Sequence, residues 1–529
     1  MSRIKLIPAV SPTGERWVQA REDERTVWIH LSDFRLDGTA AINKVAKAGI
    51  NIVGRDQARD LVQRVAALTD FPLWNIIERP GWSGAHFALN TGEIFSPAGV
   101  EPAAVVFETV PTIPVAGTHR EWRRQVASPL AEHPIAAFLM MVVFAPPLLR
   151  LSSREDNFGF EIVGRRGKGK STFQLLASSA VGIPSSNIGH KYVVSMDATR
   201  VGIESTLEAH SDMALIIDEA GLFAPDDPPR TRGRKMRDIA LKLGTGEEKR
   251  KYGNLRPQSY RTIFVISGNE PLASLTAGLS GGINEAAADR LITLPIGDRE
   301  FGLLEHCPSG FDDVRDFVKH LMACATRQHG TAIRAFLAGL VQHRHENEEG
   351  LRKRIDKLLK GFRRRVGVRK NDGSAGRVAD AFGLVMVAGR LAQYYKVLPK
   401  SFDCAAAAEF CYRLAQGTRV AEETFVEQLI RISRGSDVIP LEKSMPFRSN
   451  TQLDETTAFL HRGRRGRSEL IFWPRSFQRQ FPNFVRLLRR PEVDRMLIKE
   501  KFKGELRSTT KRSIRPGKME RVYCFVLPS

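Results

Sequence analysis

The sequence is poor in cysteine, long apolar stretches and acidic residues. Its 529 residues include 5 cysteines, which are scattered and form no Cys-x-x-Cys pair. This pattern argues against a disulfide framework or a zinc site and favours a reducing compartment, so we expect a cytoplasmic protein. The longest apolar stretch near a helix, residues 135–149, has two prolines near its end and is short for a bilayer span. Residues 1–12 lack the apolar core of a signal peptide, so no membrane partner is expected.

The shortage of acidic residues gives the chain a strong positive charge. There are 59 Asp and Glu against 80 Lys and Arg, a net charge of +21. Residues 351–370 carry ten basic residues and one acid, and residues 441–529 carry 21 basic residues and 9 acids, so these two regions hold the whole surplus. Such a balance favours nucleic acid as a partner. A generally basic, solvated surface is the alternative, and the uneven distribution argues against it.

One stretch fits the pattern of a phosphate-binding loop, G-x-x-x-x-G-K-[ST]. It reads GRRGKGKST and lies between an apolar run at 158–163 and a helix-like run at 173–181. In a turn between strand and helix, backbone N–H groups surround a phosphate at the positive end of the helix. The predicted ATP-binding residues are Gly164, Gly167, Lys168, Gly169, Lys170, Ser171 and Thr172. Lys170 would reach the β- and γ-phosphates and Ser171 would bind Mg²⁺; a chance match of a glycine-rich turn is the alternative.

Two further apolar runs end in polar residues that suit ATP hydrolysis. Residues 213–219 read MALIIDE, and paired carboxylates after an apolar strand are the companion of a phosphate loop. Asp218 would hold Mg²⁺, and Glu219 would polarise the attacking water. Residues 260–269 read YRTIFVISGN, so Asn269 would position that water from a neighbouring strand. An ordinary asparagine at a strand-to-turn junction is the alternative for Asn269.

Two arginines are candidates for reaching a nucleotide. Arg290 precedes a short apolar run, where it would stabilise charge on the ATP of a neighbouring subunit. A surface arginine or an ion pair is the alternative. Arg377 lies at the start of a helix predicted at 376–396 and would point back to the nucleotide as the arginine of a helical lid. Simple helix-end electrostatics is the alternative there.

Two basic segments are candidates for contact with nucleic acid. Three consecutive residues of a long polar loop, Lys249, Arg250 and Lys251, would grip a phosphate backbone in the channel of a ring. A solvated charge run is an equal alternative. At the end of the chain, helices predicted at 475–488 and 494–501 precede a basic hairpin, which favours a winged-helix module that binds DNA. Such a module would otherwise contact a protein.

The N-terminal region has its own α+β pattern. We expect a hairpin at 16–31, helices at 38–49 and 57–68, and a second hairpin at 80–95. The second hairpin contains Trp82, which would either stack on a base or pack in a core. Packing is the commoner fate of a tryptophan, and we favour it here.

Taken in order, these motifs resemble a known family. PGW in the N-terminal region, GRRGKGKST, DATRVGIESTLEAHSDMALIIDE, LKLGTGEEKRKYG, RTIFVISGNE and GRVADAFGLVMVAGRLA follow one another along the chain. They are similar to a domain-of-unknown-function family of AAA+ ATPases in phage, plasmid and integrative-element primase–helicases. That family includes helicases of chromosomal cassette elements, which resemble the minichromosome-maintenance helicases. The resemblance runs from about residue 15 to residue 529.

The resemblance implies an α/β fold with four parts. These are an N-terminal α+β domain at 1–118, an AAA+ P-loop ATPase core at 119–300, a helical lid or linker region at 301–440, and a basic winged-helix-like domain at 441–529. It implies a ring, expected to be a hexamer, that hydrolyses ATP between subunits and moves along DNA.

The resemblance also bears on single residues. It supports the roles given above to the phosphate loop, the paired carboxylates and Asn269, and it raises Arg290 as a finger acting on a neighbour and Arg377 as a second sensor. In one departure, the third strand ends in Gly268-Asn269-Glu270, where family members often have Gly-Glu, so the sensor lies at either Asn269 or Ser267. No primase region is evident, so a primase would be another chain.

Our first hypothesis is therefore an ATP-dependent helicase or translocase on single-stranded or forked DNA. The alternative is a nucleotide-driven switch or loader that remodels a partner protein in element maintenance or phage defence. Stimulation of ATP hydrolysis by DNA separates the two. A non-catalytic DNA-binding scaffold is a third possibility, which the pair Asp218–Glu219 argues against.

Overall fold

The structure of the chain is a computed structural model. It describes residues 4–35, 38–110, 114–154, 156–185, 192–195, 200–218, 260–272, 290–297, 299–368, 373–420, 429–430, 432–433, 438–441, 456–462, 468–481, 488, 491–502, 505–515 and 518–527. The described residues fall into two units, one up to residue 415 and one from residue 416 on. Each unit is described by itself.

The N-terminal part is an antiparallel three-stranded sheet covered by two helices. The strands are β1 (Lys5–Val10), β2 (Arg16–Glu22) and β3 (Arg25–His30), in the order β1-β2-β3, and the helices are α1 (Thr39–Lys47) and α2 (Gly54–Ala66). Val18 and Ile29 of the sheet are buried with Val45 and Leu61 of the helices. The predicted hairpin at 16–31 and both predicted helices are confirmed, because their alternating and 3.6-residue patterns each have one buried face.

The second predicted hairpin is present and belongs to the core of the first unit. It consists of β5 (Gly81–Ser83) and β6 (His86–Ala88), and β7 (Ile94–Phe95) adds a third strand. The strands β4 (Asn75–Ile77) and β8 (Ala103–Val105), which flank this segment in sequence, pair with each other. Trp82 is 5% exposed, its Nε1 donates to the Pro147 carbonyl at 2.8 Å, and Arg344 lies over its ring at 4.4 Å. Packing of Trp82 is thus confirmed.

The hairpin is also fixed to the central sheet through a buried carboxylate. Asp212 is fully buried and accepts the backbone N–H of Trp82 at 3.0 Å. Arg150 forms an ion pair with it at 2.9 Å. A Cβ atom on Gly81 would lie 2.4 Å from the Asp212 carboxylate, so glycine is required for this approach.

We expect Trp82→Phe to lower the free energy of unfolding by about 1–3 kcal/mol, because the buried Pro147 carbonyl loses its donor. Urea unfolding followed by circular dichroism measures the change. Trp28→Phe is the control, since Trp28 is half-buried in the N-terminal sheet. Equal losses for the two variants would contradict the packing described for Trp82.

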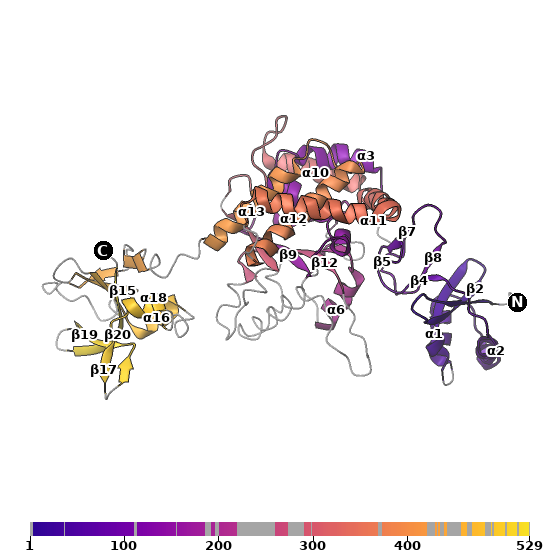
Figure 1. The fold of residues 1–529 in the computed structure, drawn as a ribbon, viewed down its shortest axis with the longest axis horizontal. Helices are drawn as coiled ribbons and strands as arrows, with labels where there is room; N and C mark the ends of the chain where they lie inside the picture. The colour runs from indigo at the N-terminus through magenta and orange to yellow at the C-terminus, as the bar shows by residue number, and fades with distance from the viewer. Residues whose placement is uncertain are drawn as a thin grey trace. The chain divides into compact units, whose positions relative to one another are not determined.

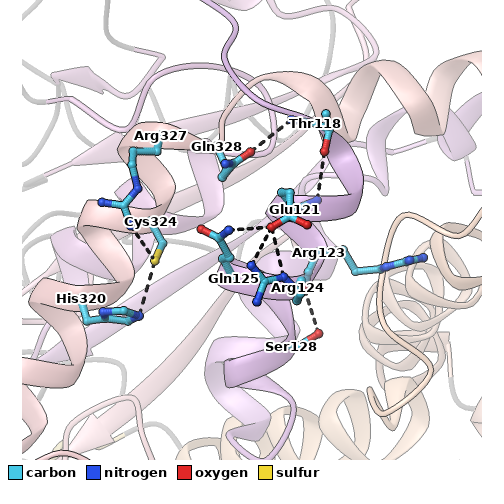
Figure 2. Close-up of polar contacts among 10 residues, drawn as sticks. All are labelled: Thr118, Glu121, Arg123, Arg124, Gln125, Ser128, His320, Cys324, Arg327 and Gln328. Carbon is cyan, nitrogen blue, oxygen red and sulfur yellow. Dashed lines mark hydrogen bonds and ion pairs between the residues drawn. The ribbon is translucent and has the colours of Figure 1, made fainter.

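The segment before the core is fastened to a helix far along the chain, as Figure 2 shows. Thr118 caps α3 (His119–Trp122) by accepting the Glu121 N–H at 3.2 Å, and its own N–H donates to the Gln328 side chain at 3.1 Å. Ala116 pairs with His329 in an isolated β-bridge. The described residues 114–118 are therefore tied to α10 and the residues that follow it.

The central sheet has five parallel strands in the order β10-β11-β12-β9-β13. Its neighbouring strands β9 and β12 are labelled in Figure 1. They are β9 (Phe158–Gly164), β10 (Val194–Ser195), β11 (Met213–Asp218), β12 (Thr262–Gly268) and β13 (Leu291–Gly297). All seven residues of β9 and of β12 are buried. Continuous apolar runs of this kind are typical of strands covered on both faces.

Helices that precede β9 and helices that lie between the strands in sequence pack around the sheet. They are η2 (Arg123–Ala127), η3 (Ser128–Leu130), α4 (Pro134–Val142), η4 (Pro146–Leu151), α5 (Lys170–Ser178) and α6 (Arg200–Ala209). Phe160 of β9 packs against Phe138 of α4 at 4.9 Å and against Phe382 of the later helix α12 (Gly373–Tyr394) at 5.1 Å between ring centroids. A helix that precedes the sheet in sequence and a helix that follows it thus share one core.

The helical region is formed by α10 (Val314–Arg327), α11 (Thr331–Arg365), α12 (Gly373–Tyr394) and α13 (Cys404–Val420). The chain breaks between α10 and α11 at Gly330, whose φ is 77°. The basic residues from 352 to 365 lie in the part of α11 that continues past a non-helical residue at Asn347. Across the parts of the chain that the structure describes, no helix has both the length and the apolar character to cross a membrane.

The second unit contains a mixed five-stranded sheet in the order β14-β15-β16-β20-β19. Its strands are β14 (Val438–Pro440), β15 (Ala458–Arg462), β16 (Ser468–Phe472), β19 (Thr510–Arg515) and β20 (Lys518–Val526), with the short hairpin β17 (Glu500–Phe502) and β18 (Glu505–Arg507). Helices α16 (Pro474–Gln480) and α18 (Pro491–Met496) precede the hairpin β19–β20. The expected hairpin is present. Helices begin close to both expected positions, but α18 ends at Met496 and residues 500–502 form β17, where the second helix was expected to continue. The strands β14 and β15 enlarge the sheet beyond the expectation.

Candidate nucleotide site

The phosphate loop lies where β9 ends and α5 begins. Gly167 and Gly169 have φ of 79° and 83°, values that favour glycine, and α5 starts at Lys170 directly afterwards. A Cβ on Gly164 would lie 2.4 Å from Ile296 of β13, so this glycine permits close packing of the two strands. The predicted strand–loop–helix context is therefore confirmed, and the first N–H groups of α5 are placed for binding an anion.

The carboxylate at the end of β11 meets the loop from the neighbouring strand. The hydroxyl of Ser171 donates to Asp218 Oδ1 at 2.8 Å, and the hydroxyl of Ser267 donates to the same oxygen at 2.8 Å. Because β11 and β12 are parallel neighbours, their carboxyl ends bring these side chains together. Ser267, the alternative to Asn269 as the sensor residue, therefore lies beside Asp218.

Asn269 and Lys170 meet at the same edge of the sheet. The Lys170 ammonium donates to Asn269 Oδ1 at 3.2 Å and to the carbonyl of Arg165 at 2.9 Å. An open cavity of about 580 Å³ lies over this group. Its lining consists of Arg166, Gly167, Lys168, Gly169, Lys170, Ser171, Thr172, Ser267, Gly268 and Asn269.

The donor set fits a magnesium–triphosphate group. Ser171 and Asp218 offer a hydroxyl and a carboxylate oxygen within 2.8 Å of each other, and Mg²⁺ in such sites prefers oxygen ligands of this kind. Lys170 adds a positive charge at the edge of the same cavity. The size, charge and ligands of the cavity thus suit a nucleoside triphosphate.

The far side of the loop is held by a segment that sequence reasoning missed. Lys168 Nζ donates to the Arg299 carbonyl at 2.8 Å, so Lys168 is turned toward the segment after β13. A Cβ on Gly302, whose φ is 64°, would lie 2.4 Å from the Lys168 carbonyl oxygen. The loop therefore rests against backbone, which fixes its shape.

Glu161 is a second missed residue. It lies inside β9 and is 1% exposed. Its carboxylate accepts the Leu272 N–H at 2.6 Å and the Thr293 hydroxyl at 3.1 Å, which connects β9 to the segment after Asn269 and to β13. Burial raises the pKa of Glu161 from 4.5 to about 7. A glutamate within the apolar run FGFEIV was the signal in the sequence.

This pKa predicts a pH-dependent stability. Because the folded pKa of Glu161 is raised, its contribution is complete below pH 4.5 and is lost as pH rises through about 7. We expect Glu161→Gln to unfold like the wild type at pH 4.5 and to be more stable at pH 8 by up to about 3 kcal/mol. Urea midpoints at both pH values measure this. The exposed Glu300→Gln is the control, and a gain for Glu161→Gln that is equal at both pH values would contradict the assignment.

Arg290 lies at the opposite edge of the sheet from the phosphate loop. It directly precedes β13, its carbonyl accepts the Gly159 N–H at 2.7 Å, and its guanidinium pairs with Asp156 at 3.1 Å. The parallel strand β9 has seven residues, so its two ends are about 20 Å apart. Arg290 therefore does not reach the phosphate loop of its own chain. A position away from its own loop is what we expect of an arginine that acts on a neighbouring subunit.

Arg377 needs a correction. We expected it to point back to the nucleotide, but its carbonyl accepts a hydrogen bond from Arg154, four residues before β9. The start of α12 therefore lies at the same edge as Arg290, about one strand length from the phosphate loop of its own chain. The helix expected there is confirmed; a lid arginine acting within one subunit is not supported. Glu219, Lys249, Arg250 and Lys251 lie outside the described residues.

Comparisons with known proteins agree with this fold. Residues 15–251 match the family model of DUF927, a domain of unknown function. The solved structure of SCCmec type IV Cch, an active helicase, matches with a TM-score of 0.61 at 13% identity, covering 91% of this chain and 86% of that chain. NtrX from Brucella abortus in complex with ATP matches with a TM-score of 0.21 at 15% identity, covering 59% of this chain and 64% of that chain, which is too weak to indicate a common fold. A search of curated proteins finds no match.

Proposed function

We propose that the chain is an ATP-dependent DNA helicase or translocase of a mobile genetic element or phage. The DUF927 match and the likeness to the Cch helicase support a helicase-like family. The strand order β10-β11-β12-β9-β13 supports an AAA+ P-loop core, since it places the phosphate loop beside the strands that carry Asp218 and Asn269.

One observation supports the ring assembly: the phosphate loop and Arg290 lie at opposite ends of the strands of one sheet. The phosphate loop and Asp218 stand at the carboxyl ends of the strands, and Arg290 stands at the amino ends. A ring, expected to be hexameric, would place Arg290 of one subunit against the ATP of the next. An arginine of this kind stabilises charge on the transferred phosphate.

Within that site each residue of this chain has a distinct task. The loop N–H groups and Lys170 bind the triphosphate, while Ser171 and Asp218 would hold Mg²⁺, which neutralises charge on the phosphates when bound. Glu219 would take the proton of the attacking water, and Asn269 or Ser267 would orient that water. Arg377 would join Arg290 in acting on the neighbour, as a revised role for the second sensor.

DNA is the proposed track, either single-stranded or forked. The net charge of +21 supports a polyanionic partner. We propose Lys249, Arg250 and Lys251 for the channel and a winged-helix-like role for the second unit, whose hairpin β19–β20 follows α16 and α18. Any primase activity would come from another chain.

Unwinding of a labelled forked duplex tests the proposal. The wild type should displace the strand only with ATP, and Asp218→Asn should not, because it weakens the Mg²⁺ ligand. DNA should also stimulate ATP hydrolysis. ATP hydrolysis that DNA leaves unchanged, or unwinding that persists in Asp218→Asn, would overturn it.

A further inference from the structure

Arg154 is a buried arginine that the nucleotide chemistry described above does not use. It is 9% exposed and lies four residues before β9. Its guanidinium lies over the Phe158 ring at 4.3 Å, and burial lowers its pKa to about 10. Among the described residues, its second terminal nitrogen has no hydrogen-bond partner.

Stability alone does not account for an arginine here. A buried guanidinium loses its hydration, and an unpaired N–H adds to that cost. An apolar side chain of similar length would fill the space over Phe158 without these penalties. The contacts of the remaining nitrogens are therefore the better guide to what Arg154 does.

Those contacts connect Arg154 to the segments that hold Arg290 and Arg377. Nε donates to the Asp156 carbonyl at 3.3 Å, and the Asp156 side chain pairs with Arg290. One terminal nitrogen donates to the carbonyl of Arg377 at the start of α12. The fork of Arg154 thus holds both the segment that fixes Arg290 and the N-terminal part of α12, which carries Arg377.

We propose that Arg154 is a positioning residue that sets Arg290 and Arg377 in one arrangement for the ATP of a neighbouring subunit. This inference rests on the proposed ring ATPase. It ties the central sheet to the helical region at the edge that faces the neighbour. Arg154 itself does not touch ATP, and its own phosphate loop is about 20 Å away.

The test uses Arg154→Met, which keeps the length and the apolar contact with Phe158, and Arg154→Lys, which keeps the charge. We expect Arg154→Met to lower kcat for ATP hydrolysis by about 10- to 100-fold with an unchanged KM, because the two arginines are displaced slightly. Arg154→Lys should recover part of kcat. Thermal unfolding like that of the wild type confirms that the variants fold. If Arg154→Met does not fold, the kcat and KM of Arg154→Lys alone decide the test.

Mixed assemblies separate this inference from the proposed function. Arg154→Met has an intact phosphate loop, whereas Lys170→Ala has an intact far edge, so mixing the two should restore hydrolysis. Arg290→Ala mixed with Lys170→Ala is the reference. Rescue of Arg290→Ala without rescue of Arg154→Met overturns the inference alone, as does a raised KM with an unchanged kcat. Failure of both mixtures overturns the shared site and the inference with it.

Discussion

Replacing Lys170 with alanine is expected to lower the rate of ATP hydrolysis by about 100- to 1,000-fold, the usual cost of removing one charge-stabilising donor. Lys170 Nζ lies within 3.2 Å of Asn269 Oδ1, at the edge of the cavity where the terminal phosphates would bind. Without it, negative charge developing on the transferred phosphate has no cation from the loop. Phosphate release, with and without forked DNA, measures the rate.

Lys168→Ala is the matched control for Lys170→Ala. Both lysines belong to the same loop, but Lys168 donates to the Arg299 carbonyl. We expect the control to lose less than about tenfold in rate, because it removes a side-chain support of the loop and leaves the backbone N–H of this position to bind phosphate. Equal losses in the two variants would mean that the loop tolerates neither change, and would contradict a special role for Lys170.

Arg290→Ala should lower ATP hydrolysis by about 1,000-fold or more if Arg290 supplies charge to a neighbouring site. Binding of ATP to the variant's own loop should persist, since that loop lies at the opposite end of β9. Binding of a fluorescent ATP analogue and phosphate release measure the two properties separately.

Two controls sharpen the Arg290 result. Arg315→Ala removes an exposed arginine of α10 and should leave hydrolysis unchanged. Dilution of the wild type to concentrations at which assemblies dissociate should reproduce the loss seen in Arg290→Ala. Full activity of a monomeric wild type would refute a site completed by the neighbour.

Much of the arrangement at the carboxyl ends of the central strands could be predicted from the sequence. Apolar strands that end in polar residues bring those residues together when the strands are parallel neighbours in a sheet. The phosphate loop, Asp218 and Asn269 needed no further information. Arg377 was misplaced because a helix-start arginine carries no signal of the edge to which its helix is packed. That choice depends on tertiary contacts such as Phe382 against Phe160.

Residues that support the site were harder to predict. Gly302 and Arg154 act through backbone approach and through carbonyl groups, which leave no pattern at fixed spacing. Glu161 stood out as an acid in an apolar run, but its partners come from segments more than a hundred residues away. The enlarged sheet of the second unit was missed because β14 has three residues and β15 has five.

The buried carboxylate of Asp212 has a mechanical consequence. It directly precedes β11, the strand that ends in Asp218, and it holds the backbone of Trp82 in the N-terminal hairpin. A shift of β11 along its axis would therefore pull on that hairpin, and force applied to the hairpin would reach the far end of the strand. In the proposed motor, the hairpin that contains Trp82 is thereby placed to restrain a movement of β11 or to be moved by it.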